Sequence, residues 1–256
     1  MSSLFLKLAT LGLLLFSAAG LSAQQPQMDA KVKEIVQYID QLYRSESSFS
    51  EVEMDIVTSH WERTLKMKIW TEGTKKTFIR ITAPKKEDGV GTLRIGNEMW
   101  NYLPKTNKVI KIPPSMMMSS WMGSDFNNDD LVSEFSLWED YRYSRIHPDY
   151  AEPGFIYIEC IPRENLAVVW GRIVMKVREN DKMPVQDRYY DEKGKLMRLM
   201  NYSNIREFDG KKLPSVIELI PQDEEGNKTV LRYLSLDFNL PLENDIFSLR
   251  NLRSYR

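Results

Sequence analysis

Two periodicities divide the chain into predicted helices and strands. Near its start, Val32, Ile35, Val36 and Ile39 follow the i, i+3, i+4, i+7 spacing of an amphipathic helix, which predicts a helix over about residues 29–44. From residue 50 onward, apolar and polar residues alternate, as is typical of strands that expose one face to water. This alternation predicts strands at residues 50–56, 64–69, 78–82, 91–95, 98–103, 108–112, 155–161, 172–178, 184–190, 196–208, 212–220 and 229–238.

The alternation stops between residues 113 and 143, where a Met-rich run leads into a second helical pattern at about 125–141. Short gaps between the ten to twelve predicted strands favour antiparallel neighbours, and a sheet this wide twists and curls. We therefore expect an α+β fold that is mainly β, with a curved half-barrel whose concave face the two helical segments cover. No linker composition interrupts residues 27–256, which predicts a single domain.

The first 23 residues have the pattern of a secretory signal peptide. Lys7 precedes an apolar stretch at residues 8–16, and small residues follow it up to Ala23. The stretch is shorter than the roughly 20 residues of a transmembrane helix, although an uncleaved anchor is the alternative. The only cysteine is Cys160, so no lipid-attachment cysteine follows the predicted cut after residue 23. We therefore expect a periplasmic protein that is soluble after cleavage.

Composition and charge exclude several functions. Lys and Arg total 35 against 36 Asp and Glu, so no positive excess is available to bind nucleic acid. One cysteine and two histidines, His60 and His147, cannot form an intramolecular disulfide or a Cys/His zinc cage. Neither histidine has the spacing of a catalytic triad, and the acidic residues at 125–130 lack a calcium-loop pattern. We predict no catalytic residue, metal ion or cofactor.

The Met-rich run is the most unusual segment of the sequence. Of the 13 methionines, four lie within seven residues together with a tryptophan, and this group comprises Met116, Met117, Met118, Trp121 and Met122. Methionine adapts its shape and suits surfaces that accept varied apolar partners. The run is either ordinary core on the concave face or a lid over a ligand cavity.

Two segments around this run carry a family resemblance. Residues 98–112 (EMWNYLPKTNKVIKI) and 119–131 (SSWMGSDFNNDDL) resemble the periplasmic outer-membrane lipoprotein-sorting proteins of the LolA/LolB-like superfamily. The resemblance implies an unclosed antiparallel barrel with a helical lid, enclosing an apolar cavity for the acyl chains of a lipoprotein or lipid. The chain resembles the broader family more than LolA itself, so another lipid is an open alternative as cargo.

The resemblance and the alternation together give a candidate set of cavity residues. The early strands and the motif strand would line the cavity, and the Met-rich run would form its lid. A register error of one residue would exchange the inside and outside sets. The predicted cavity residues are Met54, Ile56, Leu65, Met67, Ile69, Ile79, Ile81, Trp100 and Tyr102, and the predicted lid residues are Met116, Met117, Met118, Trp121, Met122 and Phe126.

Three functions follow in order of preference. The first is a non-enzymatic periplasmic carrier that shuttles lipoproteins or lipids toward the outer membrane, with an inner-membrane transporter and an outer-membrane acceptor as its partners. The second is a lipid-sensing or interaction domain of an envelope regulatory or transport system. The third, a secreted hydrolase, has little support from the residues.

Overall fold

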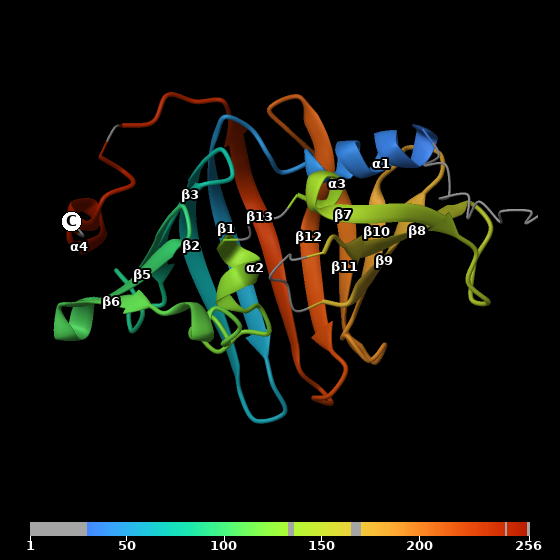
Figure 1. Ribbon diagram of the computed structural model, residues 1–256. Helices are drawn as coiled ribbons and strands as arrows, with labels where there is room; N and C mark the ends of the chain where they lie inside the picture. The colour runs from blue at the N-terminus through green and yellow to red at the C-terminus, as the bar shows by residue number, and fades with distance from the viewer. Residues whose placement is uncertain (1–29, 133–135, 165–169, 244, 255–256) are drawn as a thin grey trace, which may run out of the picture.

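A computed structural model describes residues 30–132, 136–164, 170–243 and 245–254. Within these residues the strands form one 13-stranded sheet in which neighbours are antiparallel (Figure 1). The strands are β1 (Ser47–Val57), β2 (Glu62–Glu72), β3 (Lys76–Ala83), β4 (Gly91–Ile95), β5 (Glu98–Leu103), β6 (Lys108–Ile112), β7 (Tyr141–Ile146), β8 (Phe155–Pro162), β9 (Arg172–Arg178), β10 (Pro184–Tyr190), β11 (Leu196–Phe208), β12 (Lys211–Pro221) and β13 (Lys228–Phe238).

The strand order shows how the chain builds this sheet. It runs β6-β5-β4-β3-β2-β1-β13-β12-β11-β10-β9-β8-β7, so the first and the last strand of the sequence pair at its centre. Their register extends from Ser48 opposite Phe238 to Val57 opposite Lys228. The strands β6 and β7 are the two edges and do not pair with each other, so the sheet is unclosed, as the sequence predicts.

Helices cover parts of both faces of the sheet. We call the face that α1 and the Met-rich segment cover the inner face, and the opposite one the outer face. The buried side of α1 packs against β7, β8 and β9, whereas Leu252 of the C-terminal α4 packs on the outer face against Phe78 and Leu93. The helices are α1 (Ala30–Asp40), α2 (Asn128–Val132), α3 (Leu137–Asp140) and α4 (Leu249–Arg253), with short 3₁₀ turns at Pro104–Thr106 and Pro114–Met116.

The inner face carries two apolar clusters. One joins α1 to β7–β9 through Ile35, Ile158 and Met175. The other joins β1, β2 and β3 to β11, β12 and β13, and the segment before α2 packs onto it through Trp121 and Phe126. These clusters hold the helical segments against the sheet and leave space between them.

The predicted strands are confirmed, but two features differ from expectation. The strand β7 was not predicted, and the single helix predicted at 125–141 is wrong: two short helices, α2 and α3, end before this strand. β7 is six residues long and buries Tyr141 and Tyr143 against β8, an alternation too short to stand out beside a helical pattern. The N-terminal helix ends at Asp40, earlier than predicted, and the predicted signal peptide lies outside the described residues.

Within the described part of the chain, every helix is too short or too polar to cross a bilayer.

Candidate functional site

A cavity of about 420 Å³ lies on the inner face, between α1, the segments around α2 and α3, and the sheet. This volume lies in the lower half of the range of about 300–1,000 Å³ that is typical of ligand pockets. Its walls come from α1, α2, α3, β2, β3, β7, β9–β13 and the segment before α2, so residues from both halves of the chain meet there. Most of the exposed wall is apolar, with contributions from Ile69, Ile79, Phe126, Ile173, Ile217 and Leu231.

The seven cavity residues predicted on β1, β2 and β3 share the inner face, but they do not share the cavity. Ile69 and Ile79 line it. The other five lie in the apolar cluster beneath Trp121 and Phe126, which fill the space above them. Those five, each at most 2% exposed, are Met54, Ile56, Leu65, Met67 and Ile81.

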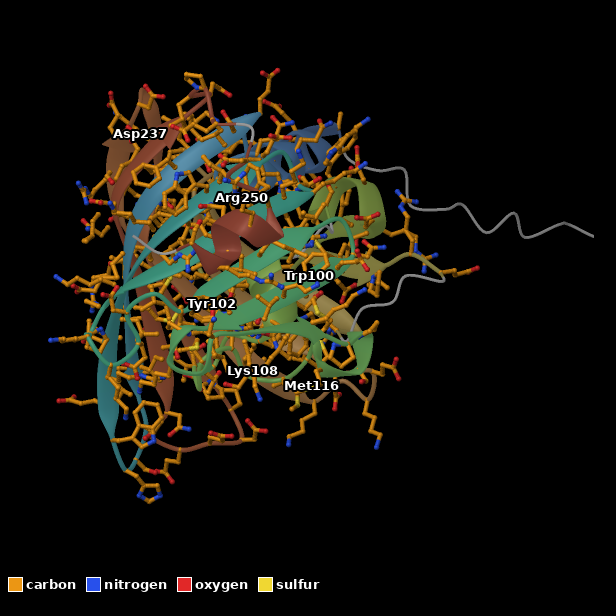
Figure 2. The ribbon with its side chains drawn as sticks, turned by 90° about the vertical axis from the view of Figure 1, so that its left-hand side faces the viewer. Trp100, Tyr102, Lys108, Met116, Asp237 and Arg250 are labelled. Atoms are coloured by element: carbon orange, nitrogen blue, oxygen red, sulfur yellow. The ribbon has the colours of Figure 1, made fainter. Side chains whose placement is uncertain are left out.

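The predicted face of the motif strand β5 is wrong. Trp100 and Tyr102 pack with Phe78 and Leu252 on the outer face, beside α4, while Met99 belongs to the inner cluster. Figure 2 views the molecule from this side and shows both residues near Arg250 of α4. Adjacent strand residues point to opposite faces, so a shift of one residue explains the exchange.

The predicted lid residues divide into buried and exposed members. Trp121 is 1% exposed, and its indole N–H donates to Thr92 Oγ1 at 3.1 Å. Met117 and Met122 pack against the inner cluster, and Phe126 lines the cavity. Met116 and Met118 are 48% and 40% exposed. The segment is therefore core over β1–β3 and borders the cavity only at its end.

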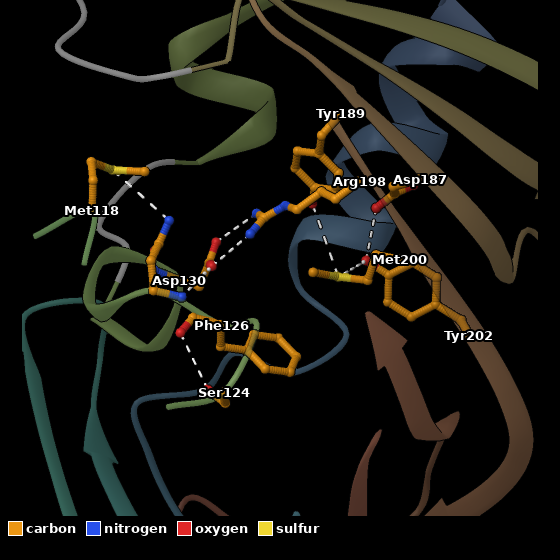
Figure 3. Close-up of polar contacts among 10 residues, drawn as sticks. Met118, Ser124, Phe126, Asp130, Asp187, Tyr189, Arg198, Met200 and Tyr202 are labelled. Atoms are coloured by element: carbon orange, nitrogen blue, oxygen red, sulfur yellow. Dashed lines mark hydrogen bonds and ion pairs between the residues drawn. The ribbon is translucent and has the colours of Figure 1, made fainter. Parts of the chain in front are cut away.

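A buried polar cluster, which is not among the predicted site residues, lines the same cavity. Asp187 and Tyr189 of β10 and Arg198, Met200 and Tyr202 of β11 alternate along their strands and share the inner face (Figure 3). Asp187 pairs with Met200, and Tyr189 with Arg198, across the two strands. The available signal was one charged residue on each strand in the same period-two series as an aromatic residue, Asp187 with Tyr189 and Arg198 with Tyr202, because residues two positions apart share a face.

Contacts with three residues hold the guanidinium group of Arg198 in place. Its two Nη atoms donate to the two carboxylate oxygens of Asp130 at 2.7 and 2.6 Å. The rings of Trp170 and Tyr189 lie over the guanidinium at 4.3 and 4.4 Å. Burial opposes the charge, but the hydrogen bonds and charge of Asp130 outweigh it and raise the pKa of Arg198. Its Nε has no partner.

Asp187 is 3% exposed, and only one of its two carboxyl oxygens has a hydrogen-bond partner. Its Oδ2 accepts a hydrogen bond from the Tyr202 hydroxyl at 2.7 Å, and its Oδ1 has no partner. Burial raises the pKa of Asp187 to about 7, against the opposing hydrogen bond from Tyr202 and the charge of Arg198. Burial also raises the pKa of Asp129, and the nearby charge of Asp130 adds to this effect.

The described residues offer little for covalent or metal chemistry. Nowhere in ranges 30–132, 136–164, 170–243 and 245–254 do three His, Cys, Asp or Glu side chains gather as metal ligands. Cys160 is buried, and burial raises the pKa of its thiol, which keeps it protonated.

A second cavity of about 590 Å³ lies on the outer face, under the C-terminal segment. Its lining includes Lys68, Arg80 and Glu243 beside Trp70 and Phe78. Arg80 donates through Nη2 to backbone carbonyls of α4 at 2.9 and 3.0 Å, which ties the segment to the sheet. Although larger, this space is more polar, and neither of the buried unpartnered atoms of Asp187 and Arg198 faces it, so the inner cavity is the better candidate.

Comparison with known proteins identifies the fold. A family model described as "Uncharacterized protein" matches residues 73–254. No curated protein matches the chain by sequence. A DUF1329 family protein from Desulfovibrio piger is similar in structure, with a TM-score of 0.75 and 22% identity over 86% of this chain and 97% of that one.

Two further solved structures share this architecture. A putative outer membrane lipoprotein-sorting protein domain from Vibrio parahaemolyticus has a TM-score of 0.73 and 21% identity, covering 87% of this chain and 98% of its own. A LolA superfamily protein from Nitrosomonas europaea has a TM-score of 0.71 and 19% identity, covering 86% and 98%. The fold of the present chain is thus that of these proteins.

Proposed function

The chain belongs to the family whose model matches residues 73–254 and has the LolA-superfamily fold, and from this premise we propose that it is a non-enzymatic carrier of acylated cargo. The cargo is a lipoprotein or a lipid whose acyl chains occupy the inner cavity. Residues 1–23 direct export to the periplasm, and residues 27–256 act as one domain that moves cargo toward the outer membrane. The structural similarity to a putative outer membrane lipoprotein-sorting protein domain from Vibrio parahaemolyticus supports this direction of transport.

The inner cavity is the observation that carries the proposal. Its wall is mainly apolar, and it lies between the sheet and short helices rather than inside the packed cluster beneath Trp121. Each methylene group removed from water contributes about 0.8 kcal/mol, so a sixteen-carbon chain left in water costs on the order of 12 kcal/mol relative to a membrane. A carrier must offset most of this free energy and still release its cargo.

Lipid binding is tested on the full chain, exported and purified without detergent. We expect mass spectrometry of its organic extract to detect an acyl lipid in near-stoichiometric amount. We also expect the delipidated protein to bind a fluorescent fatty-acid analogue. If no lipid co-purifies and the analogue does not bind, the carrier proposal is wrong.

A matched pair of variants locates the binding. Ile217→Trp adds a large ring to the cavity wall, so it should displace the fluorescent analogue and weaken its binding at least tenfold. Leu234→Trp adds the same ring on the same sheet at an exposed position outside the cavity, so it should leave binding unchanged. Equal binding by both variants would place the acyl chain elsewhere.

A further inference from the structure

Two buried hydrogen-bonding atoms, on side chains that line the inner cavity, have no partner in the protein. They are the Nε donor of Arg198 and the Oδ1 acceptor of Asp187, and these residues are 5% and 3% exposed. Unpaired buried polar atoms are rare and costly, so each needs an explanation. Among the described residues, the only other such atoms belong to Arg63 and Glu87, which do not line this cavity.

The bonds already made leave one free edge on each group. The Nη atoms of Arg198 are used by Asp130, and the rings of Trp170 and Tyr189 pack against its guanidinium, which leaves the Nε donor without a partner. Asp187 Oδ2 is used by Tyr202, which leaves Oδ1. Arg198 and Asp187 are diagonal neighbours on β10 and β11, a relation in which long side chains reach each other. One small group can therefore contact both.

The charges around the cavity select against an ionised ligand. Asp129, Asp130 and Asp187 face it together with Arg198, and from α1 Asp40 pairs with Arg44 at 3.4 Å. A carboxylate or phosphate head would meet this excess of acidic groups. An ammonium head could not accept a hydrogen bond from Arg198 Nε and would leave that donor unpaired. An uncharged group with both a donor and an acceptor satisfies both atoms.

We propose that the inner cavity recognises an uncharged hydroxyl or amide group at the head of its acyl cargo. This group accepts a hydrogen bond from Arg198 Nε–H and donates one to Asp187 Oδ1. The hydrocarbon tail then lies along Ile69, Ile79 and Ile217. The inference rests on the proposed carrier function and specifies the chemical class of its cargo.

A set of ligands with equal chain length tests the head group on the unaltered protein. Dodecanol and N-methyldodecanamide carry a donor and an acceptor, methyl laurate carries an acceptor only, and laurate and dodecylamine are charged. We expect the first two to displace a bound fluorescent lipid about tenfold more effectively than the other three, which corresponds to the value of one added hydrogen bond. The better of the two identifies the head as a hydroxyl or an amide.

The outcomes separate the two proposals. Equal affinity for all five ligands, or a preference for laurate or dodecylamine, overturns the head-group inference and leaves the carrier function standing. Failure of every ligand to bind overturns both. The ranking is measured on the native protein, so it decides the inference even if a variant fails to fold.

A double variant then assigns the preference to Asp187. Asp187→Leu combined with Tyr202→Phe removes both partners of one hydrogen bond, which avoids leaving the Tyr202 hydroxyl buried without an acceptor. We expect the preference for dodecanol over methyl laurate to disappear. Asp55→Leu is the matched control, because Asp55 bonds Thr64 and Arg232 outside the cavity, and it should keep the preference. An unchanged preference in a folded double variant contradicts the assignment.

Discussion

At the scale of single residues, the fold holds the carboxyl group of Asp187 almost fully away from water. Burial is the main cause of its raised pKa of about 7, and the Tyr202 hydroxyl and Arg198 only partly compensate. Asp130 lies in the same cavity but makes two hydrogen bonds with Arg198. Neighbouring carboxyl groups thus differ in how well they are satisfied, and the less satisfied one is free to meet a ligand.

The raised pKa of Asp187 predicts a pH-dependent stability. Between about pH 4, where an unfolded Asp titrates, and pH 7, the folded protein binds more protons than the unfolded chain, so its stability falls as the pH rises. Asp187→Asn removes this loss. The difference in unfolding free energy between the variant and wild type should grow, in favour of the variant, by about 2–3 kcal/mol from pH 5 to pH 8. Urea denaturation at each pH measures this difference.

A second carboxyl group provides the control for this measurement. Hydrogen bonds from Thr64 and Arg232 outweigh burial and lower the pKa of Asp55, so it titrates below pH 5 in both states. The stability difference between Asp55→Asn and wild type should therefore stay constant from pH 5 to pH 8. A constant difference for Asp187→Asn as well would show that its pKa is not raised.

At the scale of elements, the Met-rich segment combines core and surface within a few residues. Its chain is turned back by hydrogen bonds from Trp121 N–H to Phe126 O at 2.8 Å and from Ser124 N–H to Trp121 O at 2.9 Å. This places the Trp121 ring in the inner cluster and leaves Met118 at the surface. The core interpretation of the sequence therefore applies to Trp121, whereas Met118 lies at the surface and does not line the cavity.

The two kinds of residue in this segment should respond differently to truncation. Trp121→Ala removes a fully buried ring and the bond to Thr92, and should cost about 3–5 kcal/mol of unfolding free energy. Met118→Ala, at a 40% exposed position of the same segment, should change stability by less than about 0.5 kcal/mol. Chemical denaturation measures both values. Similar small losses would mean that Trp121 is a mobile lid residue rather than core.

The positions of the strands could be predicted from the sequence, but which face of each strand points inward could not always be predicted. The bounds of β5, β10 and β11 agree with the alternation, because period two is a local property of the chain. The face that is buried depends on what packs there. The α4 helix covers one side of β5, so both faces of that strand carry apolar residues, and Trp100 was assigned to the wrong one. The buried polar cluster also depends on contacts between distant parts of the chain, since Asp130 accepts hydrogen bonds from Arg198, which lies 68 positions away in the sequence.

At the scale of the whole molecule, the cavity exists because β1 and β13, the first and last strands of the sequence, pair with each other. Joining β1 to β13 brings Ile69 and Ile79 of the N-terminal half opposite Ile217 and Leu231 of the C-terminal half. A ligand bound there contacts both halves at once. It binds the folded chain and not the unfolded one, so its binding free energy adds to the stability of the entire sheet.

Lipid binding should therefore raise the melting temperature of the protein. At a free dodecanol concentration 100 times its dissociation constant, the added stability is about 2.7 kcal/mol. For a domain of this size, about 2–4 °C follows from each kcal/mol, so the melting temperature should rise by about 5–10 °C. Differential scanning calorimetry across a dodecanol titration measures the shift. Ile217→Trp, which weakens binding at least tenfold, should reduce the shift to about half or less at the same dodecanol concentration, whereas Leu234→Trp should retain it. A shift of equal size in both variants would mean that dodecanol stabilises the chain from a site other than the space that β1 and β13 bring together.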